Sequence, residues 1–83
     1  MNEIKLIVRT HDLTHKQEVT ISSDQKVSDV KEGAKREFSL PDSNYELFNF
    51  TSGKTLNDSQ TLREAGVNNH DTLDLRLLPG GGS

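Results

Sequence analysis

The C-terminal end of the chain has a composition suited to chemistry at a chain terminus rather than in a pocket. Residues 73–78 read Leu-Asp-Leu-Arg-Leu-Leu, and Pro79 and Gly80-Gly81-Gly82-Ser83 follow them. Proline has no N–H to give to a strand ladder, and glycine has no side chain that can pack. We therefore expect a folded domain over residues 1–78 and a thin, mobile tail over residues 79–83, which we interpret as the working part. The same Gly-Ser composition is typical of flexible linkers, which is the alternative interpretation.

Three other patterns look like sites, and each has a simpler interpretation. His11 and His15 are four residues apart, but they fall in a predicted turn, where this spacing does not form a metal-binding pair. The run Ser52-Gly53-Lys54-Thr55 lacks the earlier glycine of a phosphate-binding loop, because Phe48 occupies that place. The acidic residues lie on a loop or among lysines on a helix face, which is the usual solvated arrangement. We expect no catalytic residue, no metal ion and no cofactor.

Composition narrows the class of protein further. The chain has 83 residues, 30% of them hydrophobic, which is enough for one domain with a modest core. It has no cysteine, so disulfides, thiolate metal sites and a cysteine nucleophile are excluded. Neither a membrane-length apolar run nor an N-terminal signal pattern occurs, so we expect a cytoplasmic protein that does not enter membranes. A net charge of -3 without a basic stripe argues against nucleic acid as a partner.

The alternation of apolar and polar residues predicts five strands that position the tail. They are expected over residues 4–9, 17–21, 45–50, 55–56 and 72–78. The first two strands are close in sequence, so we expect them to pair as an antiparallel hairpin. In the last strand, Leu73, Leu75 and Leu77 fall on one face and Asp74, Arg76 and Leu78 on the other, as in a half-buried strand.

Two helical segments are predicted between these strands. The main helix is indicated by four apolar residues at helical spacing, Val27, Val30, Ala34 and Phe38. Ser28 is its expected N-cap, and it should end before Leu40-Pro41. Gly33 weakens the middle of this helix by roughly 1 kcal/mol relative to alanine. The run Thr61-Leu62-Arg63-Glu64 fits a capping box that opens one helical turn, which Gly66 ends.

These elements predict an α+β domain. The order is two strands, a helix, two strands, a short helical turn and a last strand. One helix must then cover one face of a mixed sheet of four to five strands.

Several short runs together carry a family resemblance. They are Leu6-Ile7-Val8-Arg9-Thr10, Val27-Ser28-Asp29-Val30-Lys31, Leu40-Pro41-Asp42, Gly53-Lys54-Thr55-Leu56, Thr61-Leu62, Gly66-Val67 and Asp71-Thr72-Leu73. In this order and spacing, over about residues 3–82, the chain resembles ubiquitin and its relatives, which have the β-grasp fold. The resemblance places the terminal diglycine of the family at Gly81-Gly82. Ser83 is then an overhang of the kind that a protease removes in this family.

The resemblance implies a protein modifier that performs no catalysis itself and acts as a monomer. An ATP-dependent activating enzyme would adenylate the exposed carboxylate of Gly82, a conjugating enzyme would take it up as a thioester, and an amine of a target protein would receive it. Gly80 and Gly81 would thread narrow enzyme channels, where a Cβ would clash. The enzymes would dock on the residues just before the glycines, namely Arg76, Leu77, Leu78 and Pro79.

One departure from ubiquitin points to dedicated enzymes. Ubiquitin has an arginine where this chain has Leu78, and that position helps activating enzymes to choose among modifiers. In this respect the chain resembles bacterial ubiquitin-like modifiers, which work with their own activating enzyme, conjugating enzyme and zinc-dependent processing protease. Two other functions stay open, a sulfur carrier that forms a C-terminal thiocarboxylate and a binding domain with an inert tail. The Ser83 overhang favours the modifier, because sulfur carriers usually end at the diglycine.

The apolar patch by which ubiquitin is recognised maps onto residues that differ here. The matching candidates are Leu13 or His11, Phe48, Asp74 and Arg76. Two of these positions are charged, so we expect that ordinary ubiquitin-binding domains do not bind this chain. Phe48 either folds over the adjacent turn or forms a contact patch on the open face of the sheet. Leu13, at the hairpin tip, has the same two interpretations.

Overall fold

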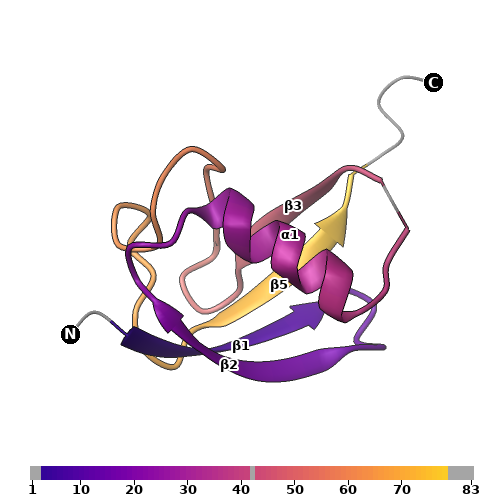
Figure 1. The fold of residues 1–83 in the computed structure, drawn as a ribbon, viewed down its shortest axis with the longest axis horizontal. Helices are drawn as coiled ribbons and strands as arrows, with labels where there is room; N and C mark the ends of the chain where they lie inside the picture. The colour runs from indigo at the N-terminus through magenta and orange to yellow at the C-terminus, as the bar shows by residue number, and fades with distance from the viewer. Residues whose placement is uncertain (1–2, 42, 79–83) are drawn as a thin grey trace.

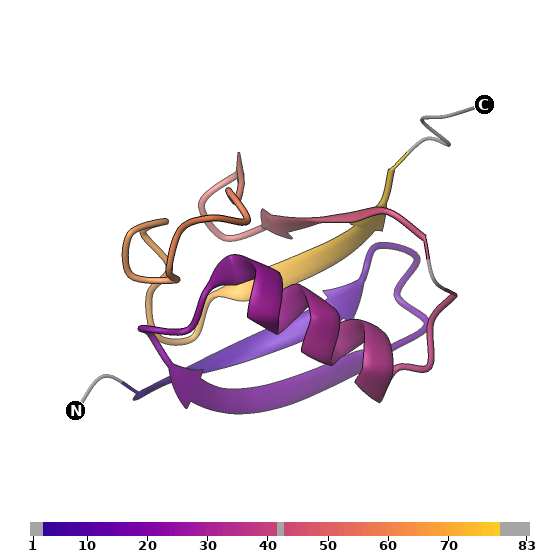
Figure 2. The ribbon, with the colours of Figure 1, turned by 45° about the horizontal axis from the view of Figure 1, so that its top comes forward.

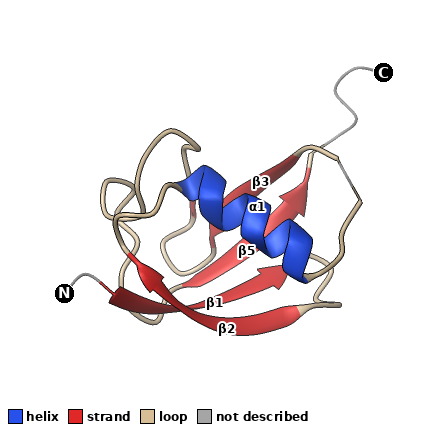
Figure 3. Cartoon of the chain, viewed as in Figure 1, coloured by secondary structure: helices blue, strands red, loops and turns tan. Residues whose placement is uncertain are grey.

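The computed structural model describes residues 3–41 and 43–78 of the chain. Its elements are β1 (Glu3–Thr10), β2 (Lys16–Ser22), α1 (Val27–Glu37), β3 (Tyr45–Asn49), β4 (Lys54–Thr55) and β5 (Thr72–Leu77). The five strands form one sheet, and α1 lies across one face of it (Figures 1 and 3). The predicted α+β architecture, with its single helix on a mixed sheet, is therefore confirmed.

The sheet places the last strand of the chain at its centre. The strand order is β2-β1-β5-β3-β4. β1 pairs with β2 as the predicted antiparallel hairpin, and β5 is parallel to β1 and antiparallel to β3. β5 is therefore paired on both sides over residues 73–75, and its last two residues are paired with β3.

The core lies between the sheet and α1. Alternate residues of each strand point to this side, which is why Leu6 and Leu47 are at most 1% exposed. The buried apolar residues are Leu6, Val8, Val27, Ala34, Tyr45, Leu47, Leu56, Leu62, Val67, Leu73 and Leu75. They come from β1, α1, β3, β5 and the 56–67 loop, so one contiguous core ties these elements together.

The apolar face of α1 is the predicted one, but the start of the helix is not. The prediction that Ser28 is the N-cap is wrong, because Lys26 holds that position without a side-chain cap. The first two N–H groups of the helix donate instead to the backbone carbonyls of Gln60 and Asp58, at 2.9 and 3.3 Å. A distant loop thus supplies the acceptors that a cap would otherwise provide. No helix in the described part of the chain is long and apolar enough to cross a membrane.

The capping box at residue 61 has its predicted geometry. The Thr61 N–H donates to the Glu64 carboxylate at 3.0 Å, and the Glu64 N–H donates to the Thr61 hydroxyl at 3.1 Å. The helical segment that it opens is a single turn, in which the Ala65 N–H donates to the Thr61 carbonyl. Gly66 then takes a positive φ of 77°, which ends the turn as predicted.

Candidate functional site

The predicted tail follows directly on the end of β5. Leu78 is the last described residue, and its N–H donates to the carbonyl of Asn44 at 2.9 Å. This hydrogen bond holds the chain beside the start of β3. The predicted docking and conjugation residues beyond it, Pro79, Gly80, Gly81, Gly82 and Ser83, lie outside the described residues.

Apolar side chains are exposed at the point where the tail begins. Leu77 is on the same face of β5 as the buried Leu73 and Leu75, but it is 64% exposed. Leu75 lies opposite Thr10, the last residue of β1, whereas Leu77 is paired only with Tyr45 of β3. Because β1 ends before this point, β5 has a neighbouring strand on one side only at Leu77, and the core does not extend to this residue. Leu78 is also exposed, and both leucines are available to a partner.

The tip of the β1–β2 hairpin lies at the same end of the sheet. β1 and β5 are parallel, and the His11 N–H donates to the Leu75 carbonyl at 3.0 Å. Leu13, at the tip, is 64% exposed and has a positive φ of 64°. Figure 2 shows this hairpin turn and the end of β5 at one end of the molecule. Leu13, Leu77 and Leu78 are therefore exposed apolar residues at this end of the sheet, and we call them the tail-root leucines.

The sheet face opposite α1 carries the other candidate residues. Arg9 of β1, Asp74 of β5 and Phe48 of β3 are neighbours in register across three strands. Arg76 lies opposite Glu46 in the β3–β5 pairing. The structure therefore brings Phe48, Asp74 and Arg76 together on this face, with Arg9 beside Asp74.

Asp74 is not the surface residue that the sequence indicates. It is only 2% exposed, and the Arg9 Nε atom lies 2.5 Å from its Oδ1 atom. The exposed His11 ring lies on the other side, with Nδ1 3.9 Å from Oδ2. Asp74 is thus buried as one half of an ion pair, which keeps its carboxylate away from a partner protein.

Phe48 and Arg76 cover each other. The Arg76 guanidinium lies 3.7 Å from the centre of the Phe48 ring, which is close enough for a cation–π interaction. Phe48 is half-buried as a result. The surface that would be apolar in ubiquitin is therefore covered here by a charged group.

Neither Arg9 nor Phe50 was predicted from the sequence to belong to the group of residues on the sheet face opposite α1. The Arg9 guanidinium lies 4.6 Å from the centre of the Phe50 ring, and Phe50 itself is 57% exposed. A signal was available, because Arg9 lies on the outward side of the first predicted strand. The sequence alone does not show that β5 pairs with β1, and this pairing places Asp74 beside Arg9.

The titratable groups of the hairpin stabilise its turn and are not arranged for catalysis. The hydroxyl groups of Thr10 and Thr14, each 2.7 Å from the Asp12 carboxylate, lower the pKa of Asp12 to about 2. His15 lies against the Phe38 ring at 5.1 Å, away from His11. Among residues 3–41 and 43–78, no three acidic or histidine side chains gather in a way that could hold a metal ion.

We expect no binding by a ubiquitin-binding domain that uses the apolar patch of ubiquitin. Such a domain would have to remove Arg76 from Phe48 and would find the buried Asp74 ion pair instead of apolar side chains. The measurement is a chemical-shift titration of the labelled chain, with ubiquitin titrated in parallel as the positive control. Saturable micromolar binding that shifts the Phe48 amide would contradict this prediction.

Comparison with known proteins agrees with the arrangement of strands and helix. The ubiquitin family model matches residues 6–79. None of the curated proteins matches the chain significantly.

Several solved structures share the fold, all at low sequence identity. The ubiquitin of Caldiarchaeum subterraneum is 22% identical with a TM-score of 0.79, over 96% of this chain and 99% of that one. A designed protein based on ubiquitin is 20% identical with a TM-score of 0.80, over 99% and 96% of the two chains. The ubiquitin-like domain of an Arabidopsis thaliana protein is 19% identical with a TM-score of 0.78, over 100% and 85%.

Proposed function

Because this chain belongs to the ubiquitin family, we propose that it is a non-catalytic protein modifier that is joined to target proteins through Gly82. In this proposal, residues 1–78 form a monomeric domain in the cytoplasm, and residues 79–83 form the tail that enzymes process and load. The domain presents the tail, and partner enzymes supply the catalysis.

The short sequence separation between the end of β5 and the diglycine is the observation that carries the proposal. β5 ends at Leu77, the N–H of Leu78 is bound to Asn44, and the diglycine follows within four residues. Four residues reach at most about 14 Å when fully extended. This length lets the carboxylate of Gly82 enter a narrow channel of an enzyme that is docked against the end of the sheet.

The proposed chemistry begins with hydrolysis of the Gly82–Ser83 bond by a processing protease, which is zinc-dependent in the bacterial relatives that the chain resembles. The freed carboxylate attacks ATP in the activating enzyme and forms an acyl adenylate with release of pyrophosphate. A cysteine thiol displaces AMP, the acyl group passes to the conjugating enzyme, and a target amine displaces the thiol. Gly80 and Gly81 have no Cβ, so they fit the channels in which each step occurs.

The tail-root leucines are the proposed docking surface for these enzymes. Leu13 and Leu77 are each 64% exposed, and Leu78 lies next to the tail. Exposed apolar residues that gather at one place commonly mark protein interfaces. Pro79 and Arg76 flank this surface in the sequence and complete the proposed docking segment.

Incubation of the tagged chain with an extract of its source cells and ATP tests the proposal. We expect ATP-dependent adducts of higher mass that survive denaturation and thiol reductants, because an amide bond resists both. A sulfur carrier would instead gain only the mass difference of a thiocarboxylate at its own C-terminus. An inert binding domain would keep its mass with or without ATP, and either of these results would contradict the modifier function.

A further inference from the structure

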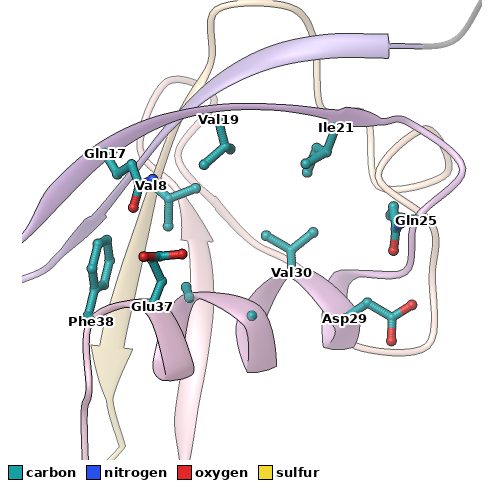
Figure 4. A pocket seen from close by; sticks show the side chains of 11 residues that line it. Val8, Gln17, Val19, Ile21, Gln25, Asp29, Val30, Glu37 and Phe38 are labelled. Carbon is teal, nitrogen blue, oxygen red and sulfur yellow. The ribbon is translucent and has the colours of Figure 1, made fainter.

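An open groove between β2 and α1 has a shape that suits a thin linear molecule. It has a volume of about 280 Å³, and its walls are mainly apolar. Figure 4 shows Val19 and Ile21 of β2 pointing toward Val30 of α1 across this space. Sites for drug-sized molecules usually have about 300–1,000 Å³. A groove of this smaller volume, open to solvent along its length, is a better match for an aliphatic chain than for a large ring system.

A glycine in the helix wall leaves the middle of the groove open. Gly33 lines the groove, and a Cβ built there would meet no atom within 4 Å. Its backbone is helical, so the fold does not require glycine, and alanine would favour the helix. The open space at Gly33 allows methylene groups to lie directly on the helix backbone.

Each end of the groove has a carboxylate and a carboxamide. Asp29 and Glu37 line it, four residues before and after Gly33. Figure 4 shows Gln25 at the same end as Asp29, and Gln17 at the same end as Glu37. Neither carboxylate forms an ion pair with any residue in the described part of the chain. A primary ammonium group has three N–H donors, which match the oxygen acceptors at each end.

The separation of the two ends determines the length of a ligand that reaches both. Asp29 and Glu37 are eight residues apart on the helix, which is a rise of about 12 Å. A staggered chain of about nine single bonds, each about 1.5 Å long, spans roughly 11 Å. Such a chain joins the two nitrogens of 1,8-diaminooctane, whereas those of 1,4-diaminobutane are much closer together.

From these features we propose that the groove binds a linear aliphatic diamine in its extended form. One ammonium group binds Asp29 and Gln25, the other binds Glu37 and Gln17, and the methylene chain lies on Gly33 between the apolar walls. The walls select an uncharged chain, and the two carboxylates select its length. This binding uses neither the tail nor conjugation, and it is therefore independent of the proposed function.

A chemical-shift titration of the labelled full-length chain with 1,8-diaminooctane tests this inference. We expect saturable shifts at Val19, Val30 and Gly33 and a Kd below about 10 mM at low salt. The shorter 1,4-diaminobutane has the same two charges, and octylamine has the same chain with one charge, so each should bind at least about 5-fold more weakly. Spermidine has the same span but carries a charge in the middle of its chain, where the walls are apolar, and it should also bind more weakly.

Two charge-matched variants locate the binding in the groove. Glu37→Gln removes a carboxylate from one end and should weaken binding about 3-fold, the effect expected for one exposed ion pair. Glu32→Gln removes the same charge from the same helix outside the groove lining, so it should leave binding unchanged. Gly33→Leu places a side chain in the groove and should weaken binding at least about 5-fold while the chain stays folded.

Four results would overturn the inference. They are no saturable binding of 1,8-diaminooctane, equal affinity for this diamine and 1,4-diaminobutane, tighter binding of spermidine, and equal effects of Glu37→Gln and Glu32→Gln. The last three would show that ammonium groups bind to the acidic surface by charge alone.

Discussion

Deletion of residues 80–83 should abolish all covalent adducts of this chain while it leaves the free energy of unfolding unchanged. The deletion removes the acyl carbon of Gly82, on which the entire proposed reaction sequence depends. It removes none of the described core residues, whose buried apolar side chains run from Leu6 to Leu75, and it retains the hydrogen bond from Leu78 to Asn44. We expect complete loss of adducts in source-cell extract with ATP, and a free energy of unfolding within about 0.5 kcal/mol of the full chain.

Deletion of Ser83 alone is the matched control for this experiment. It exposes the Gly82 carboxylate directly, so adducts should form as in the full chain and without need for a processing protease. If the chain shortened by four residues still forms adducts, the acyl group is not that of Gly82. If the chain that lacks only Ser83 forms none while the full chain does, the conjugation site has been placed wrongly.

Replacement of Arg9 by leucine should destabilise the domain by about 3–5 kcal/mol, the usual cost of leaving a buried charge without its partner. Asp74 is only 2% exposed, and apart from Arg9 the described residues bring only the His11 ring near its carboxylate, at 3.9 Å. The net stability of an 83-residue domain is about 4–12 kcal/mol, so the effect is a large part of the total. Urea unfolding followed by circular dichroism measures it.

Arg63→Leu provides the matched control for the Arg9 variant. Arg63 pairs with Asp24 at the same distance of 2.5 Å, but both side chains are more than half exposed. We expect at most about 1 kcal/mol there. The double variant Arg9→Leu with Asp74→Leu should recover most of the stability, since an apolar pair can replace a buried ion pair. Equal losses for Arg9→Leu and Arg63→Leu would show that burial does not determine the strength of the pair.

Local patterns were sufficient to predict most of the fold. The alternation in Leu6 and Val8, the helical spacing from Val27 to Ala34, and the capping box at Thr61 each act within a few residues. Ser28 failed as an N-cap because the carbonyls of a loop thirty residues later satisfy the start of the helix. The failed prediction depended on a tertiary contact, which local sequence does not contain.

The candidate site was harder to predict because its character depends on which strands become neighbours. Alternation assigns Asp74 to the outward face, where a carboxylate is ordinarily solvated. Insertion of β5 between β1 and β3 places it beside Arg9 instead and buries it. The same alternation places Leu77 on one face with Leu73 and Leu75, which are buried, but β1 ends opposite Leu75 and leaves Leu77 exposed. In both cases the exposure of the residue depends on its position in the sheet, which the periodicity alone does not give.

Mass spectrometry of the tagged chain, recovered from its source cells under denaturing conditions, tests the central claim most directly. After proteolysis, the account predicts branched peptides in which the carboxyl group of Gly82 is joined to a lysine amine of another protein and Ser83 is missing. Recovery of a chain that still ends in Ser83, or of one that ends in a thiocarboxylate and has no branched peptide, would contradict it.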